Sequence, residues 1–275
     1  LNDPKSPDHI PGARVVAAFK GGSPDVESSH TRVDKFAEEI RTKYGVEIVP
    51  DIPTLLSKVD AVLLESVDGR VHLEQARPVI AARKPLFIDK PMASTLKDVK
   101  EIARLAKEAG TPWFSTSSLR YSDPATQLKF ADATGAITWG PAPFEEHHQL
   151  DLSWYGIHAV EMLYTLLGTG CQEVVRTSSE SMDEVTCRWK DGKIGSVRLV
   201  RPYSGYGAVV FRPKQVMQSA PDSKFSYVPL VREAIKFFQT RQPPVPNEET
   251  LEIFAFMDAA QRSKESGGKP VKLLQ

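Results

Sequence analysis

Several features that would place a protein in a specialised class are scarce in this 275-residue sequence. No apolar run approaches the roughly 20 residues that a helix needs to cross a bilayer. The two cysteines, Cys171 and Cys187, are too few for a disulfide framework. The 35 basic residues are balanced by 35 acidic ones, whereas nucleic-acid-binding proteins normally carry a basic surplus. We therefore expect no membrane span and no nucleic-acid partner.

The composition is that of a globular chain, with 41% hydrophobic and 25% charged residues, which can bury a sizeable core. The first eleven residues, Leu1–Pro11, are polar and rich in proline, so we expect no signal peptide here. The simplest expectation is a cytoplasmic protein in a reducing compartment.

Residues 1–118 alternate between short apolar runs and stretches in which apolar residues recur at helical spacing. The apolar runs predict strands at Arg14–Phe19, Glu47–Val49, Ala61–Leu64, Leu86–Ile88 and Pro112–Phe114. The helical spacing predicts helices at Thr31–Tyr44, Pro53–Ser57, Val71–Ala82 and Ser94–Ala109. Continuous apolar strands that alternate with helices indicate an α/β domain with a parallel sheet covered on both faces.

The pattern changes in residues 119–275. Strand-like runs punctuated by glycine and proline occur at Ile137–Glu145, Glu184–Trp189, Lys193–Arg201 and Gly207–Arg212. Helices are predicted at Gly156–Leu167, Val228–Gln239 and Glu248–Glu265. Asp191-Gly192 between two of the strands is a hairpin signal. This half therefore predicts an α+β domain with a mainly antiparallel sheet, and we divide the chain into domains 1–118 and 119–275.

The glycine fingerprint of dinucleotide-binding sheets, G-x-G-x-x-G, is absent from the sequence. In such sheets it follows the central first strand and places a pyrophosphate on a helix N-terminus. Only 13 residues, without an apolar run, precede the Arg14 strand. A sheet without its central strand leaves buried backbone groups unpaired, at a cost of about 1–3 kcal/mol each. We therefore expect the native first strand and most of its helix to lie upstream of Leu1, and a shorter, unusual sheet is the alternative.

Asp89-Lys90-Pro91 directly follows a predicted parallel strand, at the end where open α/β sheets bind ligands. A partly desolvated lysine there can anchor a hydroxyl or carbonyl oxygen, and the following proline can adopt the cis form. An ordinary solvated lysine in a turn explains the same pattern equally well.

His158 and Glu161 lie three residues apart near the start of a predicted helix, so they share a helix face. A histidine oriented by a carboxylate can act as a general acid or base near neutral pH. A packed core histidine is the alternative.

Two further segments follow predicted strands. Lys20 occupies the place where NAD-binding folds carry an acidic residue for the ribose 2′-hydroxyl, so it favours a 2′-phosphate or merely forms a turn. Ser115–Ser118 and Arg120-Tyr121 lie where the two domains should meet, as cleft residues or as a solvated loop. Glu145 to His148 are dense in potential metal ligands, but adjacent strand residues face opposite ways and the spacing matches no zinc pattern, so we expect no metal.

Taken together, four segments resemble the glucose–fructose oxidoreductase/inositol dehydrogenase (Gfo/Idh/MocA) family over nearly the whole chain. Val62–His72, with Ala76, Ile80 and Lys84, is similar to its fourth strand, cofactor loop and following helix. Phe87 to Pro91 is similar to its E-K-P motif, with aspartate for glutamate, and Gly156 to His158 to its G-x-H helix start. Glu249–Leu273 is similar to its closing helix and final strand.

The resemblance implies a Rossmann domain that binds NAD or NADP, and a second domain whose open sheet often forms an oligomer interface, here a dimer or tetramer. It also implies hydride transfer to or from a sugar, cyclitol or related polyol. Lys90 would bind the reacting hydroxyl and His158 would exchange its proton. Lys20, Ser66, Asp89 and Lys90 are expected at the cofactor, and Arg120, Asp151 and Tyr155 at the substrate.

Many dehydrogenases of the family carry an aspartate four residues before this histidine, where the present chain has Trp154. Tyr155 or Asp151 is the candidate replacement. The substitution keeps two other functions open: a family member that binds a sugar-like ligand without turnover, and a lyase or hydrolase that uses NAD in a redox cycle.

Overall fold

The computed structural model describes residues 1–274 and divides into two compact units. The first unit comprises residues 1–115 and 228–247, and the second comprises residues 116–227 and those from 248 onward. The sequence-based division into two continuous domains differs from this, because it left residues 228–247 in the second domain. Their helix packs on the first unit through Phe237, whose ring lies 4.9 Å from that of Phe114. No helix of the described chain is long and apolar enough for a bilayer crossing.

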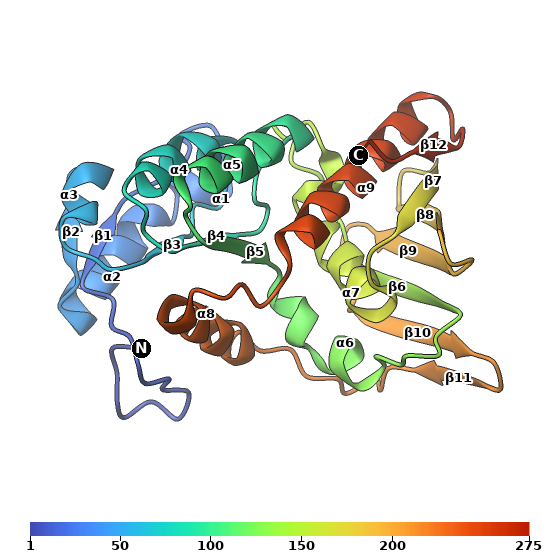
Figure 1. The fold of residues 1–275 in the computed structure, drawn as a ribbon, viewed down its shortest axis with the longest axis horizontal. Coiled ribbons are helices and arrows are strands. Elements are labelled where there is room, and N and C mark those ends of the chain that lie inside the picture. Colours follow the sequence, from blue (N-terminus) through green and yellow to red (C-terminus); the bar gives the residue numbers. More distant parts are fainter. Residues whose placement is uncertain (275) are drawn as a thin grey trace. The chain divides into compact units, whose positions relative to one another are not determined.

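The first unit contains two small sheets (Figure 1). One is a parallel pair, β1 (Ala17–Phe19) with β2 (Glu47–Val49). The other has the order β3 (Val62–Leu64), β4 (Leu86–Asp89), β5 (Trp113–Thr116), in which β3 and β4 are parallel. The helices are α1 (Glu27–His30), α2 (Val33–Tyr44), α3 (Ile52–Leu56), α4 (His72–Ala81), α5 (Leu96–Ala109) and α8 (Val228–Thr240), with a 3₁₀ turn at Gly69–Val71.

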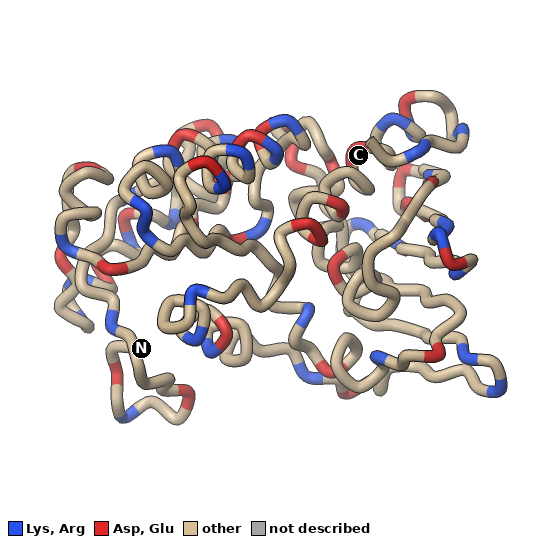
Figure 2. Tube along the Cα trace, viewed as in Figure 1, with Lys and Arg blue, Asp and Glu red and all other residues tan. Residues whose placement is uncertain are grey.

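Local sequence signals set the helix bounds of this unit. The hydroxyl of Thr95 caps α5 by accepting a hydrogen bond from the amide of Asp98 at 3.0 Å. Gly45 ends α2 and Gly110 ends α5, and both adopt the left-handed conformation that glycine allows. Acidic and basic residues are interspersed along α5 (Figure 2), and Arg104 forms ion pairs with Glu101 and Glu108. Figure 1 shows α4 and α5 on one side of β3–β5 and α8 on the other.

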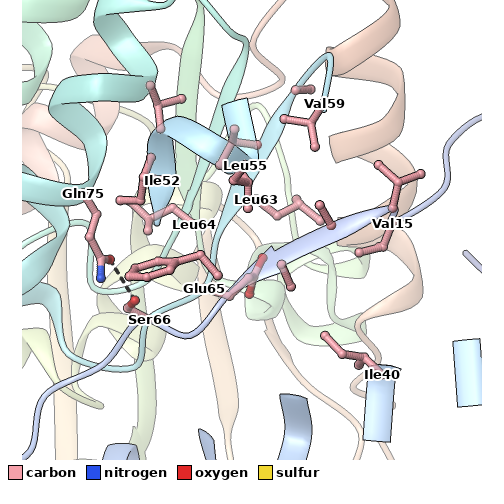
Figure 3. A pocket seen from close by; sticks show the side chains of 18 of the residues that line it. Val15, Ile40, Ile52, Leu55, Val59, Leu63, Leu64, Glu65, Ser66 and Gln75 are labelled. Atoms are coloured by element: carbon pink, nitrogen blue, oxygen red, sulfur yellow. Dashed lines mark hydrogen bonds between the residues drawn. The ribbon is translucent and has the colours of Figure 1, made fainter. Parts of the chain in front are cut away.

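No described strand joins β1 to β3, and a cavity of about 850 Å³ lies along these two strands. Its walls are mainly apolar, with Val16 and Leu63 both exposed to it. Figure 3 shows Glu65, Ser66 and Gln75 at one end of the cavity and Val15 and Val59 toward the other. The first unit thus has two parallel sheets where the sequence predicts a single one.

The second unit is built on a seven-stranded mixed sheet of order β11-β10-β6-β9-β8-β7-β12. Neighbouring strands are antiparallel except β6 and β9, which are parallel. The strands are β6 (Gly135–Pro141), β7 (Cys171–Ser178), β8 (Met182–Trp189), β9 (Ile194–Val200), β10 (Gly207–Arg212), β11 (Gln215–Gln218) and β12 (Val271–Lys272). The helices are α6 (Asp123–Gln127), α7 (Ile157–Leu167) and α9 (Asn247–Glu265), with 3₁₀ turns at Ser118–Tyr121 and Asp151–Ser153.

Helix α7 is buried along its whole length and packs on β6 and β9, and Ser263 of α9 accepts a hydrogen bond from the amide of Arg176 in β7 at 2.9 Å. Tyr164 of α7 meets Phe256 of α9 edge to face, with ring centroids 5.9 Å apart. Along β8 burial alternates, so one face of the sheet is covered by the helices and the other is exposed. The α/β plus α+β fold class is confirmed. Both cysteines are buried free thiols.

Candidate functional site

The first group of interest, which we call the strand-end cluster, lies in the first unit and consists of Glu65, Ser66, Asp89 and Lys90. Because β3 and β4 are parallel neighbours, their carboxyl ends meet at one edge of the sheet. This is the edge at which open α/β sheets bind ligands. The structure therefore brings together Ser66, Asp89 and Lys90, which the sequence predicted for the cofactor.

Burial dominates the electrostatics of the strand-end cluster. It raises the pKa of Glu65 to about 8, and the charge of Asp89 adds to the shift. It also raises the pKa of Asp89, against the attraction of Lys90. Burial lowers the pKa of Lys90, and Asp89 opposes that change. All three shifts favour the neutral forms because protein atoms crowd these groups, although Glu65 is exposed and Asp89 and Lys90 are half-buried.

The loops that carry this cluster are held by His72, a fully buried residue at the start of α4. Its Nε2 lies 2.7 Å from the carbonyl oxygen of Ser66 and its Nδ1 lies 3.2 Å from that of Met92. In the segment after β4, the Lys90–Pro91 peptide bond is cis, as the sequence suggested. A side chain at Gly69 would begin 2.9 Å from the Pro91 oxygen, so only glycine permits this approach. Sequence reasoning missed Glu65 and His72, although both follow a buried strand within a few residues.

Lys20 and Ser66 line the cavity along β1 and β3, whereas Lys90 is not among its lining residues. The ammonium of Lys20 is exposed and pairs with Asp34 at 2.8 Å. The hydroxyl of Ser66 donates to Oε1 of Gln75 at 2.8 Å, and the two lie beside each other in Figure 3.

The second group, the helix-start cluster, lies in the second unit around the first turn of α7. It comprises Thr116, Ser117, Arg120, His158, Glu161 and Glu249. His158 is 6% exposed, and its Nδ1 lies 2.6 Å from the hydroxyl oxygen of Ser117. The same oxygen accepts a hydrogen bond from the amide of Leu119 at 3.0 Å, which fixes its position. The imidazole is thus oriented through a buried serine.

Glu161 shares the inward face of α7 with His158 but does not itself hold the imidazole. Its carboxylate accepts hydrogen bonds from the Thr116 hydroxyl at 2.6 Å and the Ser117 amide at 2.9 Å. Burial raises its pKa, while the charge of Arg120 opposes the shift. Glu161 therefore positions the Thr116–Ser117 segment, and through Ser117 it supports His158.

Arg120 lies almost fully buried between two carboxylates. Its guanidinium is 3.2 Å from Glu161 and 2.6 Å from Glu249. The two negative charges outweigh the effect of burial and raise the pKa of Arg120. The structure thus gives Arg120 an internal role as counter-ion within the helix-start cluster.

The remaining candidates are divided between the site and the scaffold. Tyr155 lies beside His158, with ring centroids 5.7 Å apart. Asp151 instead forms ion pairs with the buried Arg176 at 2.7 Å and with Lys264 at 2.8 Å. Trp154, at the family's usual aspartate position, is buried and packs on Tyr155 and His148.

The two adjacent histidines have separate partners. His147 pairs with Glu145 at 2.6 Å, and His148 lies 3.1 Å from the hydroxyl of Ser153. Within residues 1–274 no group of three or more histidine, cysteine or acidic residues could hold a metal ion.

The described residues fit a nicotinamide dinucleotide at two of its parts. Lys20, Ser66 and Gln75 offer polar atoms of the kind that hold a ribose, at the polar end of the cavity. Asp89 and Lys90 lie at the carboxyl edge of the sheet, as a nicotinamide site requires. The loops after β1 and β3 lie close together. A Cβ atom added to Gly21 would stand 2.5 Å from the hydroxyl oxygen of Ser66.

Comparison with known proteins gives a family-model match in the first unit and partial matches to curated relatives. Residues 13–116 match the model of the Gfo/Idh/MocA family, described as an oxidoreductase family with an NAD-binding Rossmann fold. Inositol 2-dehydrogenase of Acidothermus cellulolyticus is 33% identical over 132 residues, which cover 46% of this chain and 35% of that protein. The 1,5-anhydro-D-fructose reductase of Ensifer adhaerens is 29% identical over 126 residues, covering 45% of this chain and 38% of that protein. The chain thus matches little more than a third of the length of these curated relatives.

Solved structures extend the likeness to nearly the whole chain. Myo-inositol dehydrogenase from Lactobacillus casei, crystallised with NAD(H) and myo-inositol, aligns with a TM-score of 0.75. The alignment covers 97% of this chain and 91% of that one, at 18% identity. At this identity the comparison establishes a shared fold.

Proposed function

We propose that this chain, whose residues 13–116 match an oxidoreductase family with an NAD-binding Rossmann fold, transfers a hydride between NAD(P) and a sugar, cyclitol or related polyol. The observation that carries the proposal is the strand-end cluster. There Lys90 stands half-buried at the carboxyl edge of a parallel sheet, where partial loss of water favours its neutral form. The names of the relatives, an inositol dehydrogenase and an anhydrofructose reductase, support this substrate class.

Lys90 and His158 have separate tasks in this function. Lys90 binds the reacting oxygen by donating a hydrogen bond, and burial lowers its pKa from the ordinary value toward the operating pH, where a proton-transfer group works best. His158 takes or returns the hydroxyl proton at Nε2, while Ser117 holds the ring through Nδ1. NAD(P), when bound, accepts or donates the hydride.

Other residues of the two clusters bind or orient. We assign Lys20, Ser66, Asp89 and Lys90 to the cofactor and Tyr155 to the substrate. We assign Arg120 to the support of Glu161, because both its ion pairs are internal. Asp151 belongs to the ion pairs of Arg176 and Lys264 and is left out of the proposed site. The predicted homo-oligomer and cytoplasmic location stay predictions.

A second function, ligand binding without turnover, is favoured by one observation. Trp154 is packed between aromatic rings at the position where many dehydrogenases of the family carry an aspartate. An enzyme of this design must therefore orient His158 through Ser117 and not through an aspartate at position 154.

The test begins with titration of NADH and NADPH followed by fluorescence, and then measures cofactor reduction across a panel of polyols. Loss of an acid–base group usually costs about 10²- to 10⁴-fold in rate, so we expect losses of that size for Lys90→Ala and His158→Ala. The exposed residues Lys107 and His30 provide matched controls as Lys107→Ala and His30→Ala. Cofactor binding without turnover on any polyol would favour the second function, and undiminished rates in both site variants would refute the first.

A further inference from the structure

Two tyrosine rings stand against His158, and the sequence pointed to only one of them. The rings of Tyr155 and Tyr206 each lie 5.7 Å from the imidazole, at interplanar angles of 76° and 82°. His158 is 6% exposed, whereas both tyrosines are only half-buried. The imidazole is therefore flanked by aromatic surface that solvent, and a ligand at His158, can reach.

The position of Tyr206 is built into the sheet. Gly140 of β6 lies under its ring, and a side chain there would begin 2.5 Å from ring carbons Cδ1 and Cε1. Any residue other than glycine would push the ring away. Phe225 supports the ring from another direction, with centroids 5.7 Å apart. Burial raises the pKa of Tyr206 further above its usual range, so its hydroxyl remains protonated at neutral pH.

We propose that Tyr206, together with Tyr155, selects ring-shaped substrates over open-chain ones at His158. A cyclitol or pyranose has rigid faces on which C–H groups gather, and such a face can lie on an aromatic ring while a hydroxyl at the edge meets the imidazole. An open-chain polyol has no fixed apolar face and loses more conformational freedom when it binds. The aromatic rings thus favour a cyclic ligand, and the tyrosine hydroxyls supply polar contacts at its rim.

This inference rests on the proposed function for its reaction, but it can be tested by binding alone. Calorimetric titration of the whole chain with myo-inositol and with sorbitol compares a ring and an open chain that both carry six hydroxyls. We expect tighter binding of myo-inositol, reduced about three- to tenfold in Tyr206→Leu and retained in Tyr206→Phe, which keeps the aromatic ring. Gly140→Ala should reproduce the loss by displacing the ring of Tyr206, with the tyrosine itself unsubstituted. Phe211→Leu, an exposed aromatic on β10, is the control.

The outcomes separate this inference from the proposed function. Ring preference that depends on Tyr206, in a protein that never reduces NAD(P), would uphold the inference and refute the function. Turnover with equal affinity for both polyols, or equal losses for both in Tyr206→Leu, would overturn the inference and leave the function standing. If Gly140→Ala unfolds the protein, the contrast between Tyr206→Leu and Tyr206→Phe decides alone.

Discussion

The strand-end cluster and the helix-start cluster both contain carboxylates and a cation, but they differ in exposure: Glu65 is exposed and Asp89 and Lys90 are half-buried, whereas Glu161 is buried. In the strand-end cluster burial shifts Glu65, Asp89 and Lys90 toward their neutral forms. In the helix-start cluster Glu161 is held by a hydroxyl, an amide and a guanidinium. The first arrangement is suited to changing its protonation near neutral pH. The second is suited to holding a geometry, so the two clusters should respond differently to substitution.

The largest effect is expected from breaking the ion pair of the helix-start cluster. In Glu161→Gln the amide NH₂ group replaces a carboxylate oxygen that faces two donors, Thr116 and Arg120. Removing one partner of a buried pair typically costs about 3–5 kcal/mol, and we expect a loss of this size in the free energy of unfolding. Denaturant unfolding measures it, with the exposed Glu248→Gln on α9 as control. A loss no larger than that of the control would mean that the ion pair of Glu161 contributes nothing to stability.

A smaller effect is expected at the serine that orients the histidine. Ser117→Ala removes the partner of His158 Nδ1 but keeps the backbone amide that binds Glu161. We expect about a tenfold lower kcat, because a ring free to rotate is less often aligned for proton transfer. Stability should fall by about 1–2 kcal/mol, because the amide of Leu119 loses its acceptor. Steady-state kinetics and a thermal melt measure the two quantities. Ser117→Thr should restore the rate, and Ser118→Ala should leave it unchanged; an unaltered kcat in Ser117→Ala would remove Ser117 from the mechanism.

The sequence predicts most of the elements because their signals are local. Helices α2 and α5 begin and end within two residues of their predicted bounds, where glycine and threonine act on the backbone directly. Strand β7 was missed, because it buries a charged residue: Arg176 is fully buried against Asp183 and Asp151. Such burial depends on partners distant in the sequence, which no apolar run reveals. The family resemblance, by contrast, is confirmed over residues 13–116.

The candidate site was only partly readable for the same reason. A residue after a buried strand is visible in the sequence, which is how Lys90 was found, whereas Ser66 was implied by the family resemblance. Glu161, three residues away, was expected to orient His158. In the structure the imidazole instead forms a hydrogen bond with the hydroxyl of Ser117, and Glu161 binds the amide of Ser117. Tyr206 had no signal, since its place depends on Gly140 in a strand more than sixty residues earlier.

The strand-end cluster should make stability depend on pH through Glu65. Its pKa is about 8 in the folded chain against an ordinary value of 4.5, so the folded state holds a proton that the unfolded state has released. Stability from this group is therefore full below pH 4.5 and is lost as the pH rises through 8. Between pH 5 and pH 8 the wild type should lose on the order of 1 kcal/mol of unfolding free energy through Glu65, a modest value because water in the cavity weakens the effect. In Glu65→Gln this loss should be absent. Denaturant unfolding at both pH values measures it, beside the exposed Glu74→Gln; parallel curves for the wild type and Glu65→Gln would refute it.

The smallest effect concerns Lys20, whose charge is exposed and already paired, unlike the groups of either cluster. Its ion pair with Asp34 is solvated, so Lys20→Ala should change the free energy of unfolding by less than about 0.5 kcal/mol. If Lys20 meets a ribose 2′-phosphate, the variant should bind NADPH about threefold more weakly and NADH as before. Asp34→Asn should act in the opposite direction, because it releases the ammonium from its competitor, and Lys35→Ala on the same helix is the control. Equal affinity of Lys20→Ala and the wild type for NADPH would limit Lys20 to its pairing with Asp34, and cofactor choice would then depend on other residues.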